Sequence, residues 1–494
     1  MAHDHPHPHG TEAEPSGGTG RVGGRPLTRR QVLRSSGAAG ALLLAPPLRT
    51  LAGGLEPPGA LAVARTSRLV PGTLAVHADL HNHSLLSDGA GDPAAAFGSM
   101  RAAGLDVAAL TDHATVSQFL PESPCVVDPS GGDCQSLAGI HEGSWQRTAA
   151  LADDADAPGE FTAIRGFEWS SPTLGHMNVW FSSDWADPLH TGGLGSPEDI
   201  AAFAADSGGP AVLSQLADLV RATPAAGAGM RGWYEWLKQD PSTPGLGGGA
   251  DGLAGFNHPG REQLRFSEFT HDPALLERVV TLELFNRRED YLFERVDEGR
   301  TSPLVACLDA GWRTGLIGVT DEHGTDWGFP EGKGRAGMWV TELSRAGVRA
   351  ALLDRRVYAT SRQGLRLDAT ANGVRMGRTL GHRTGRVELR VDLAGGPCEP
   401  GRVVGLQVLR TGSPLPAVVE AVEVAVPDAG VLTLSVDADV ADGRWLVLRV
   451  SLPDEPADGR ADSTYRAFGA GIAYSSPWWL DPDLAPGDDR PAVG

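Results

Sequence analysis

Histidines and carboxylates recur at the ends of short apolar runs between residues 72 and 364. These residue types fit metal binding, because imidazole suits zinc, iron and manganese, and a carboxylate can bridge two ions. Residues i and i+2 of a strand point to the same side, so an H-x-H or D-x-H segment places two ligands together. The candidate metal ligands are His81, His83, Asp88, His113, Glu168, His176, His258, Asp321 and His323.

The number of these candidates indicates the kind of site. A single histidine at a strand end usually caps or packs, and one H-x-H segment alone is weak evidence. Five separate strand ends that all carry His, Asp or Glu are not expected by chance. Six histidines and three acids also exceed the four ligands of one tetrahedral zinc ion. The pattern therefore predicts a centre of two or three divalent ions (Zn, Mn or Fe).

Two further polar residues are candidates for catalysis. Arg261 follows His258 by three positions and could clamp an anionic group of a substrate, or form a surface salt bridge. Asp112 precedes His113 and could orient a ligand histidine, or cap a following helix. Asn286 and Arg287, which end another apolar run, could line the pocket without binding metal.

The segment 72–364 alternates apolar runs with helix-like stretches, which include 93–103, 200–205 and 273–279. A repeating β-then-α pattern is typical of an α/β fold with a parallel sheet, closed into a barrel or doubly wound. Such folds place their active sites at the carboxyl ends of the strands. The runs are LAVHADLH, LDVAALTDH, FTAIRGFEWSS, HMNVWFS, LAGFNHP, VVTLELFN and GLIGVTDEH.

The pattern changes from residue 365. Strand-like runs such as RVELRVDL, VLTLSV and RWLVLRVSL are separated by Gly, Pro and Asp turns, which predicts a β-sandwich domain over 365–482. Residues 483–494 read as a disordered tail. The sandwich has no cluster of His, Asp or Glu with ligand spacing, so we expect it to supply no metal ligand.

Residues 1–65 read as a disordered N-terminus with an export signal. Arg29 and Arg30 precede a short apolar run over 38–45, an order that resembles a twin-arginine signal. The run is shorter than the roughly 20 apolar residues of a transmembrane helix, so no integral membrane span is expected. We therefore predict export by the twin-arginine (Tat) machinery to the cell envelope or the exterior.

Charge and cysteine content limit the partners. The formal net charge is −20, which repels phosphate backbones and argues against a nucleic-acid partner. A small-molecule substrate is expected instead. The four cysteines form no CxxC pair, so a zinc knuckle is not expected. Cys125 and Cys134 could close a short disulfide loop after export, or be unrelated.

The segments HNHSLLSDG, LTDH, NHPGR and TDEH, with the Glu168 and His176 pair, resemble the successive motifs of the PHP (polymerase and histidinol phosphatase) superfamily. The resemblance covers about 76–364 in family order, and it implies a distorted (β/α)7 barrel with a trinuclear centre. It assigns one ion to His81, His83, Glu168 and Asp321. A second ion would share Glu168 and add His176 and His258. The third would take Asp88, His113 and His323.

Within that superfamily, the EWSS, NHPGR and TDEHGTDWG segments and the closing AYSSPWW resemble the CehA/McbA-type metallohydrolases. The resemblance implies a metal-dependent hydrolase, in which bound ions lower the pKa of water from about 15.7 to about 7 and a metal-bridging hydroxide attacks. We expect a phosphoesterase. A carbamate, ester or amide hydrolase with the same centre is the alternative. A non-catalytic, metal-containing envelope binding protein fits the complete ligand set less well.

Overall fold

The computed structural model describes residues 65–115, 139–201, 220–221, 224–245, 247–328 and 334–493, which belong to one compact unit spanning 61–494. The predicted export signal at Arg29 and Arg30 lies outside the described residues, as does the Cys125 and Cys134 pair. Among the described helices, none combines the length and the apolar character needed to cross a bilayer.

All seven apolar runs form strands in the structure. Their side chains are almost all buried, which explains why the runs read as continuous apolar segments rather than as an alternation. The strands are β1 (Leu74–Asp79), β2 (Val107–Leu110), β4 (Thr162–Ser171), β5 (Gly175–Trp180), β6 (Leu253–Phe256), β7 (Val279–Asn286) and β9 (Gly315–Val319). Four more strands in this region are β3 (His113–Ala114), β8 (Glu289–Asp290), β10 (Arg335–Val340) and β11 (Val357–Thr360).

The sheet is mixed rather than parallel throughout. Parallel ladders join β1 to β2, β2 to β4, β6 to β7 and β7 to β9. Strand β5 is antiparallel to both β4 and β6, because residues 172–174 alone connect it to β4 and a parallel crossover needs a dozen or more. Strand β10 pairs antiparallel with β1 and with β11.

The segments that follow β1 and β9 pair with each other. A parallel bridge joins Asn82 to Glu322. The Asp321 N–H donates to the His81 carbonyl at 3.0 Å, and the His83 N–H donates to the Glu322 carbonyl at 2.9 Å. The α/β class is confirmed, whereas closure of the sheet as a seven-stranded barrel stays a prediction.

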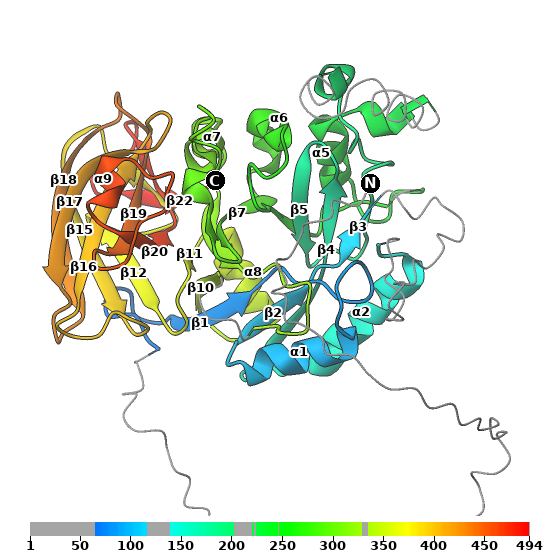
Figure 1. Ribbon diagram of the computed structural model, residues 1–494, viewed down its shortest axis with the longest axis horizontal. Coiled ribbons are helices and arrows are strands. Elements are labelled where there is room, and N and C mark those ends of the chain that lie inside the picture. Colours follow the sequence, from blue (N-terminus) through cyan, green and yellow to red (C-terminus); the bar gives the residue numbers. More distant parts are fainter. Residues whose placement is uncertain are drawn as a thin grey trace, which may run out of the picture. The chain divides into compact units, whose positions relative to one another are not determined.

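Helices cover this sheet. Helices α1 (Pro93–Ala102) and α2 (Glu142–Ala155) lie along β2 and β4 (Figure 1). Asp92 caps α1 by accepting a hydrogen bond from the Ala94 N–H, as expected for an N-cap carboxylate. The helix expected over 273–279 is only a 3-10 turn, and the one expected over 200–205 lies almost entirely outside the described residues. The remaining helical elements here are η2 (Pro224–Gly227), α5 (Met230–Lys238), α6 (Arg265–Phe269), η3 (Pro273–Leu275), η4 (Tyr291–Phe293), α7 (Pro303–Asp309) and α8 (Arg345–Leu353).

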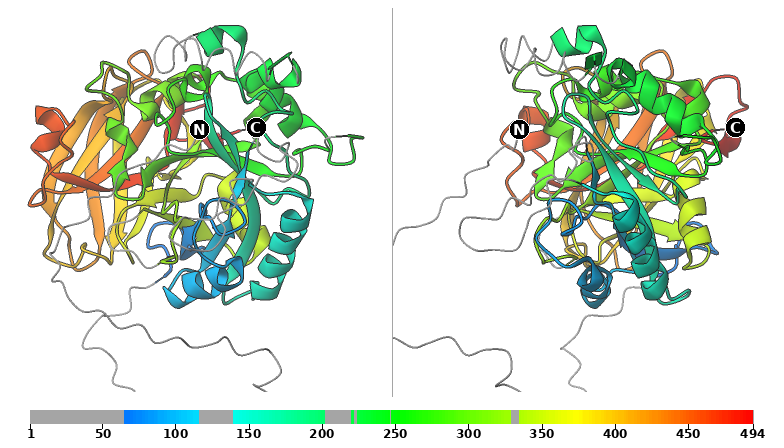
Figure 2. Two further views of the ribbon diagram at one scale, coloured as in Figure 1. Left: turned by 45° about the vertical axis from the view of Figure 1, so that its right-hand side comes forward. Right: turned by 90° about the vertical axis from the view of Figure 1, so that its right-hand side faces the viewer.

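A β-rich region follows from residue 365, as predicted. One antiparallel sheet contains β12 (Arg366–Ala371), β13 (Val374–Arg375), β15 (Thr384–Ala394) and β18 (Val431–Asp439). Antiparallel ladders also connect β16 (Val403–Arg410), β17 (Ala417–Ala425), β19 (Trp445–Leu452) and β20 (Ala470–Ser475). In the left-hand view of Figure 2 these strands, coloured yellow to red, stand next to one another.

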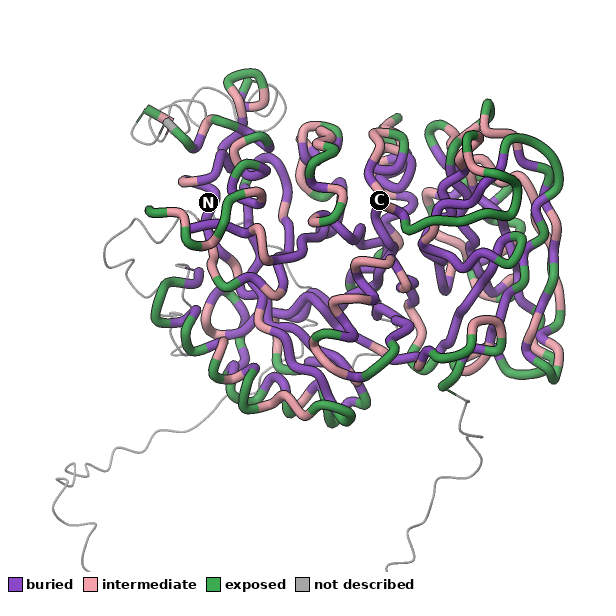
Figure 3. Tube along the Cα trace, turned by 180° about the vertical axis from the view of Figure 1, so that it is seen from behind, coloured by how far each residue is buried: buried purple, intermediate pink, exposed green. Residues whose placement is uncertain are grey.

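The two groups of strands in the β-rich region share one hydrophobic core. Leu389 and Val391 of β15 belong to the same buried cluster as Leu406 of β16 and Leu448 of β19. In Figure 3 the tube is purple along most of these strands and green along many of the connecting loops. The region also contains β14 (Arg378–Gly381), α9 (Ser463–Arg466), β21 (Trp478–Asp481) and β22 (Asp489–Pro491).

A ladder crosses the predicted domain boundary at 364. Strand β20 pairs antiparallel with β11, with Tyr358 opposite Ser475. Strand β22, which lies in the segment expected to be a disordered tail, pairs antiparallel with β14 instead. The division of the chain into a domain over 72–364 and a domain over 365–482 stays a prediction.

Candidate metal centre

The nine predicted ligands come together at the carboxyl ends of β1, β2, β4, β6 and β9 and on β5. Because β1, β2, β6, β7 and β9 run the same way within their ladders, residues that follow them arrive at one edge of the sheet. Their nitrogen and oxygen atoms form overlapping groups in which all ligand atoms lie within 4.8 Å of one another.

Glu168 is the most central of these residues. Its Oε1 lies 3.1 Å from His81 Nε2 and 3.3 Å from His258 Nε2. The same oxygen is 3.3 Å from His176 Nδ1, while Oε2 is 2.6 Å from His113 Nδ1. Burial alone would raise the pKa of Glu168, but the imidazoles of His81 and His113 outweigh it and hold the pKa well below its usual range. An ionised carboxylate that faces four imidazoles is placed to bridge ions.

His81 and His83 face each other across a short gap. Their Nε2 atoms are 3.1 Å apart, and Asp321 Oδ1 lies 3.2 Å from His83 Nε2 and 3.4 Å from His81 Nε2. Burial and the neighbouring rings of His323 and His113 lower the pKa of His83 to about 3. His83 is therefore neutral at pH 7, with a lone pair free for a metal ion.

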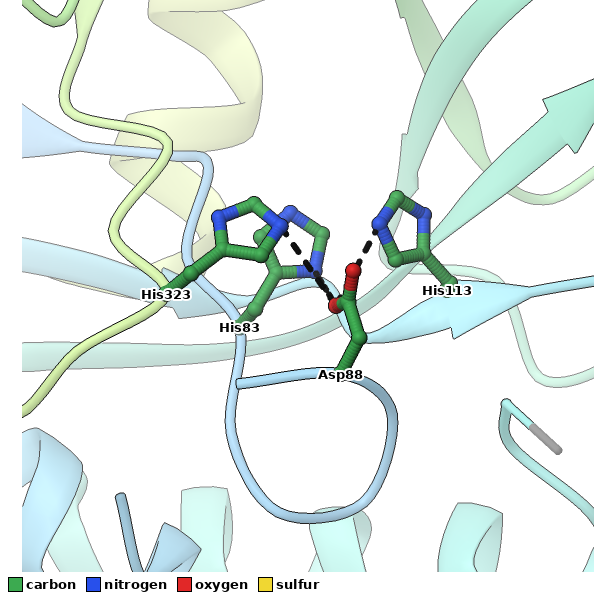
Figure 4. Close-up of side chains that lie close together, drawn as sticks. All are labelled: His83, Asp88, His113 and His323. Carbon is green, nitrogen blue, oxygen red and sulfur yellow. Dashed lines mark ion pairs between the residues drawn. The ribbon is translucent and has the colours of Figure 1, made fainter. Parts of the chain in front are cut away.

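A second group lies at the outer edge of the centre. Figure 4 shows His83, Asp88, His113 and His323 turned toward one another. Asp88 Oδ1 is 3.4 Å from both His113 Nε2 and His323 Nε2, and 3.9 Å from His83 Nδ1. The family resemblance assigns His83 to another ion, whereas the structure places it between the two groups. The Asp88 side chain is 44% exposed, so solvent reaches this group.

Several buried polar atoms of the centre make no hydrogen bond of good geometry with a described residue, although four of them lie within 3.4 Å of an ion-pair partner. A buried polar group without a good hydrogen bond costs roughly 1–3 kcal/mol, and bound cations would coordinate these atoms. The carboxylates outweigh burial and raise the pKa of His81 and His113 well above the usual value, so these imidazoles hold protons that divalent ions would replace. The donor set of imidazole and carboxylate therefore fits divalent ions. The atoms are His83 Nδ1, Glu168 Oε2, His176 Nδ1, His258 Nδ1 and Glu262 Oε2.

Two of the candidate ligands have an unusual backbone conformation. His258 has a φ of 26° and Asp321 a φ of 50°, in or near the left-handed region that residues other than glycine rarely adopt. The His258 N–H donates to Glu283 Oε2 at 2.7 Å, which helps to hold that conformation. Strained backbone of this kind concentrates at functional sites.

The centre contains two carboxylates, Glu283 and Glu262, that the sequence patterns did not indicate. Glu283 of β7 lies 2.8 Å from His81 Nδ1 through its Oε1, and its Oε2 also accepts from Asn286 Nδ2 at 2.9 Å. Glu262 Oε2 lies 3.4 Å from His258 Nδ1. The available signals were an acid inside the apolar run VVTLELFN and an acid four residues after His258. Acids are rarely buried without a partner.

We expect Glu283→Gln to weaken metal binding on the order of 10- to 100-fold, the usual effect of removing a carboxylate that orients a ligand histidine. The amide keeps the size of the side chain but loses the negative charge that orients His81. It also has one oxygen instead of two, so it cannot accept from both His81 and the His258 N–H. Competition with a chromogenic chelator measures the affinity. Glu289→Gln, at the exposed first residue of β8, is the matched control. Equal affinities for Glu283→Gln and the wild-type protein would contradict this role.

Asp112 is tied to the loop that carries Asp88. Its carboxylate accepts hydrogen bonds from the Ser84 N–H at 2.7 Å and the Ser84 hydroxyl at 2.9 Å. It also accepts one from the Ser87 hydroxyl at 2.8 Å. Asp112 thus fixes the turn between His83 and Asp88, which is a positioning role that neither sequence-based alternative described.

Arg261 and Arg287 lie beside Asp321 at the edge of the centre. Nη1 and Nη2 of Arg261 are both 3.4 Å from Asp321 Oδ2, and Nη2 also donates to the Tyr291 hydroxyl at 3.2 Å. Arg287 Nε is 3.6 Å from the same Asp321 oxygen. The Arg261 and Arg287 side chains are 39% and 46% exposed. Two guanidinium groups can therefore reach a ligand at the centre.

Comparisons with known proteins give a partial match. A family model described as "Protein of unknown function (DUF3604)" matches residues 101–191. No curated protein matches the sequence.

Two solved structures are among those similar to this chain. One is a two-domain protein from Bacteroides vulgatus ATCC 8482 that contains a predicted PHP-like metal-dependent phosphoesterase; it is 17% identical, with 83% of this chain and 98% of that chain covered and a TM-score of 0.37. The other is an amidohydrolase from Chromobacterium violaceum with bound sulfate and no metal; it is 20% identical, with 50% of this chain and 87% of that chain covered and a TM-score of 0.22.

Proposed function

We propose that the protein is an exported, metal-dependent phosphoesterase with a trinuclear centre. The observation that carries the proposal is the pair Arg261 and Arg287 beside a cluster of nine candidate ligands. Guanidinium groups bind phosphate oxygens in a bidentate manner. The two partly exposed guanidinium groups share one carboxylate, Asp321, and an anionic substrate would add a second counter-charge at this edge.

Divalent ions, when bound, supply Lewis acidity and an activated water at neutral pH. The chain's own residues hold and surround them. His81, His83 and Asp321 would hold one ion, His176 and His258 a second, and Asp88, His113 and His323 a third, with Glu168 shared by the first two. Arg261 and Arg287 would bind the non-bridging oxygens of a phosphoester, and Asp112 would keep the Asp88 loop in place.

Hydrolysis of a carbamate, ester or amide by the same centre is the second candidate. It is supported by the resemblance of the EWSS, NHPGR and TDEHGTDWG segments to the CehA/McbA-type branch. An aryl carbamate is uncharged and would add no counter-charge to the one that Asp321 already gives Arg261 and Arg287, so we favour the phosphoester.

The test uses purified protein loaded with Zn or Mn and a panel of p-nitrophenyl phosphate, bis(p-nitrophenyl) phosphate, p-nitrophenyl acetate and an aryl carbamate. Phosphoester turnover that disappears on chelation supports the proposal. Turnover of the carbamate or acetate alone supports the second candidate. A metal-loaded protein that is inactive on all four substrates would favour a metal-containing binding protein.

Export is tested separately. We expect Arg29→Lys with Arg30→Lys to retain the protein in the cytoplasm, because lysine lacks the planar guanidinium fork of arginine. Export of a folded chain also suits a centre that must be assembled around several ions. Cell fractionation with an antibody against the protein gives the readout, and Arg21→Lys, outside the signal, serves as the control. Unchanged export of the double variant would remove the twin-arginine assignment.

A further inference from the structure

A chain of buried polar contacts runs from the β-rich region to the edge of the metal centre. Its first members are Arg449 of β19 and Tyr474 of β20, both fully buried. Arg449 Nε donates to the Tyr474 hydroxyl at 3.3 Å, while its other nitrogens donate to Gln407 Oε1 and to the Gly469 carbonyl. Arg449 is therefore fixed entirely by the β-rich region, and it fixes the Tyr474 hydroxyl in turn.

The Tyr474 hydroxyl donates to Asp290 Oδ2 at 2.7 Å. Asp290 belongs to β8, in the segment that follows β7 of the α/β region, and its Oδ1 accepts from the Leu292 N–H at 3.1 Å. Asp290 is thus the N-cap of the 3-10 turn η4. One carboxylate therefore joins the β-rich region to the start of η4, which begins with Tyr291.

Tyr291 brings this chain of contacts to the centre. It is buried, and its hydroxyl accepts from Arg261 Nη2 at 3.2 Å. Arg261 in turn faces Asp321, one of the candidate ligands. A second contact between the regions holds the same segment, because Arg460 Nη1 donates to Glu294 Oε2 at 2.6 Å. The position of the Arg261 guanidinium therefore depends on side chains more than 180 residues later in the sequence, such as Tyr474.

We infer that Tyr474 and Asp290 are positioning residues for the substrate's anionic group, which they affect through Tyr291 and Arg261. The inference rests on the proposed function, since it takes Arg261 as the group that binds a phosphate oxygen. It assigns the β-rich region a part in substrate affinity although that region contributes none of the candidate metal ligands among the described residues.

The test is Tyr474→Phe in the full-length protein. Phenylalanine keeps the ring, which packs at 5.3 Å from that of Phe285, and removes only the hydroxyl. We expect the Kd for inorganic phosphate, measured by calorimetry on metal-loaded protein, to rise about three- to tenfold, the effect of one net hydrogen bond. The KM for p-nitrophenyl phosphate should rise similarly, with kcat and metal content unchanged.

Tyr465→Phe is the matched control. Tyr465 is equally buried in the β-rich region, and its hydroxyl donates to the Pro416 carbonyl at 2.8 Å rather than to the η4 segment. This variant should bind phosphate as the wild-type protein does. If Tyr474→Phe does not fold, Asp290→Asn replaces it, because the amide retains the cap on Leu292 but loses the charge that Tyr474 bonds.

A double-mutant cycle separates positioning from a general loss of stability. Tyr474→Phe should have no further effect on phosphate binding when Arg261→Ala is already present, because coupled residues are not additive. Wild-type phosphate affinity in folded Tyr474→Phe, or full additivity with Arg261→Ala, overturns the inference alone. A wild-type protein that neither binds phosphate nor hydrolyses a phosphoester overturns the proposed function and this inference together.

Discussion

The Glu168→Gln variant is expected to bind at least one metal ion fewer than the wild-type protein and to lose roughly 10³-fold or more in activity. Glu168 is buried and faces the imidazoles of His81, His113, His176 and His258. A neutral amide cannot bridge two cations, so more than one position of the centre is weakened. Metal-ion catalysis supplies several kcal/mol of transition-state stabilisation, and each 1.36 kcal/mol is a factor of ten in rate.

Elemental analysis of the purified variant, alongside its turnover of the preferred substrate, gives both values. Glu160→Gln is the control, because Glu160 is an exposed residue that pairs with Arg101 on the surface. Circular dichroism should show the same fold for both variants. A full metal complement in folded Glu168→Gln would show that this carboxylate does not bridge ions.

Removal of the metal ions should lower the melting temperature of the protein markedly. An ion that binds only the folded state stabilises it by about 4 kcal/mol when its concentration is 1,000 times the Kd, and 1 kcal/mol shifts the melting temperature by about 2–4 °C in larger domains. We therefore expect the melting temperature to fall by on the order of 10 °C, because the buried histidines and carboxylates of the centre lose the cations that they bind. Differential scanning calorimetry with and without chelator measures it.

Addition of Zn or Mn to the chelated protein should restore the original melting temperature, whereas Mg should restore less, because imidazole is a poor ligand for it. The Glu168→Gln variant should show a smaller difference between the chelated and loaded forms. Identical melting curves for protein that elemental analysis shows to be loaded and protein shown to be stripped would contradict the prediction.

The strands could be predicted from the sequence where a local apolar pattern marks them. Each of the seven apolar runs became a strand because both of its faces are buried, and burial is visible in the sequence as an uninterrupted apolar stretch. The direction of a strand is not visible in this way. The antiparallel course of β5 follows from the short connection 172–174. Strands β10 and β11 were not predicted, because Arg335 and Tyr358 interrupt their apolar character.

The candidate site was predicted as far as its ligands follow strand ends. His81, His113 and His258 stand out because a histidine after an apolar run has no obvious packing role. Glu283 and Tyr291 do not stand out, because their importance comes from contacts that form only when distant strands meet. Tyr474 and Asp290 are 184 positions apart in the sequence, and no spacing rule relates such positions.

The ladder between β11 and β20 has a consequence for attempts to produce a shorter version of the chain. A protein that ends near residue 364 would lack β20, and the edge of β11 that pairs with Ala473, Tyr474 and Ser475 would be left without a hydrogen-bonding neighbour. All four residues of β11 are buried and uncharged, so the exposed edge would be an apolar template for strands of other molecules. Self-association through β11 is then the expected fate of such a fragment. Two lysines placed on β11 would oppose this self-association, but they would also destabilise the core in which the β11 side chains are buried.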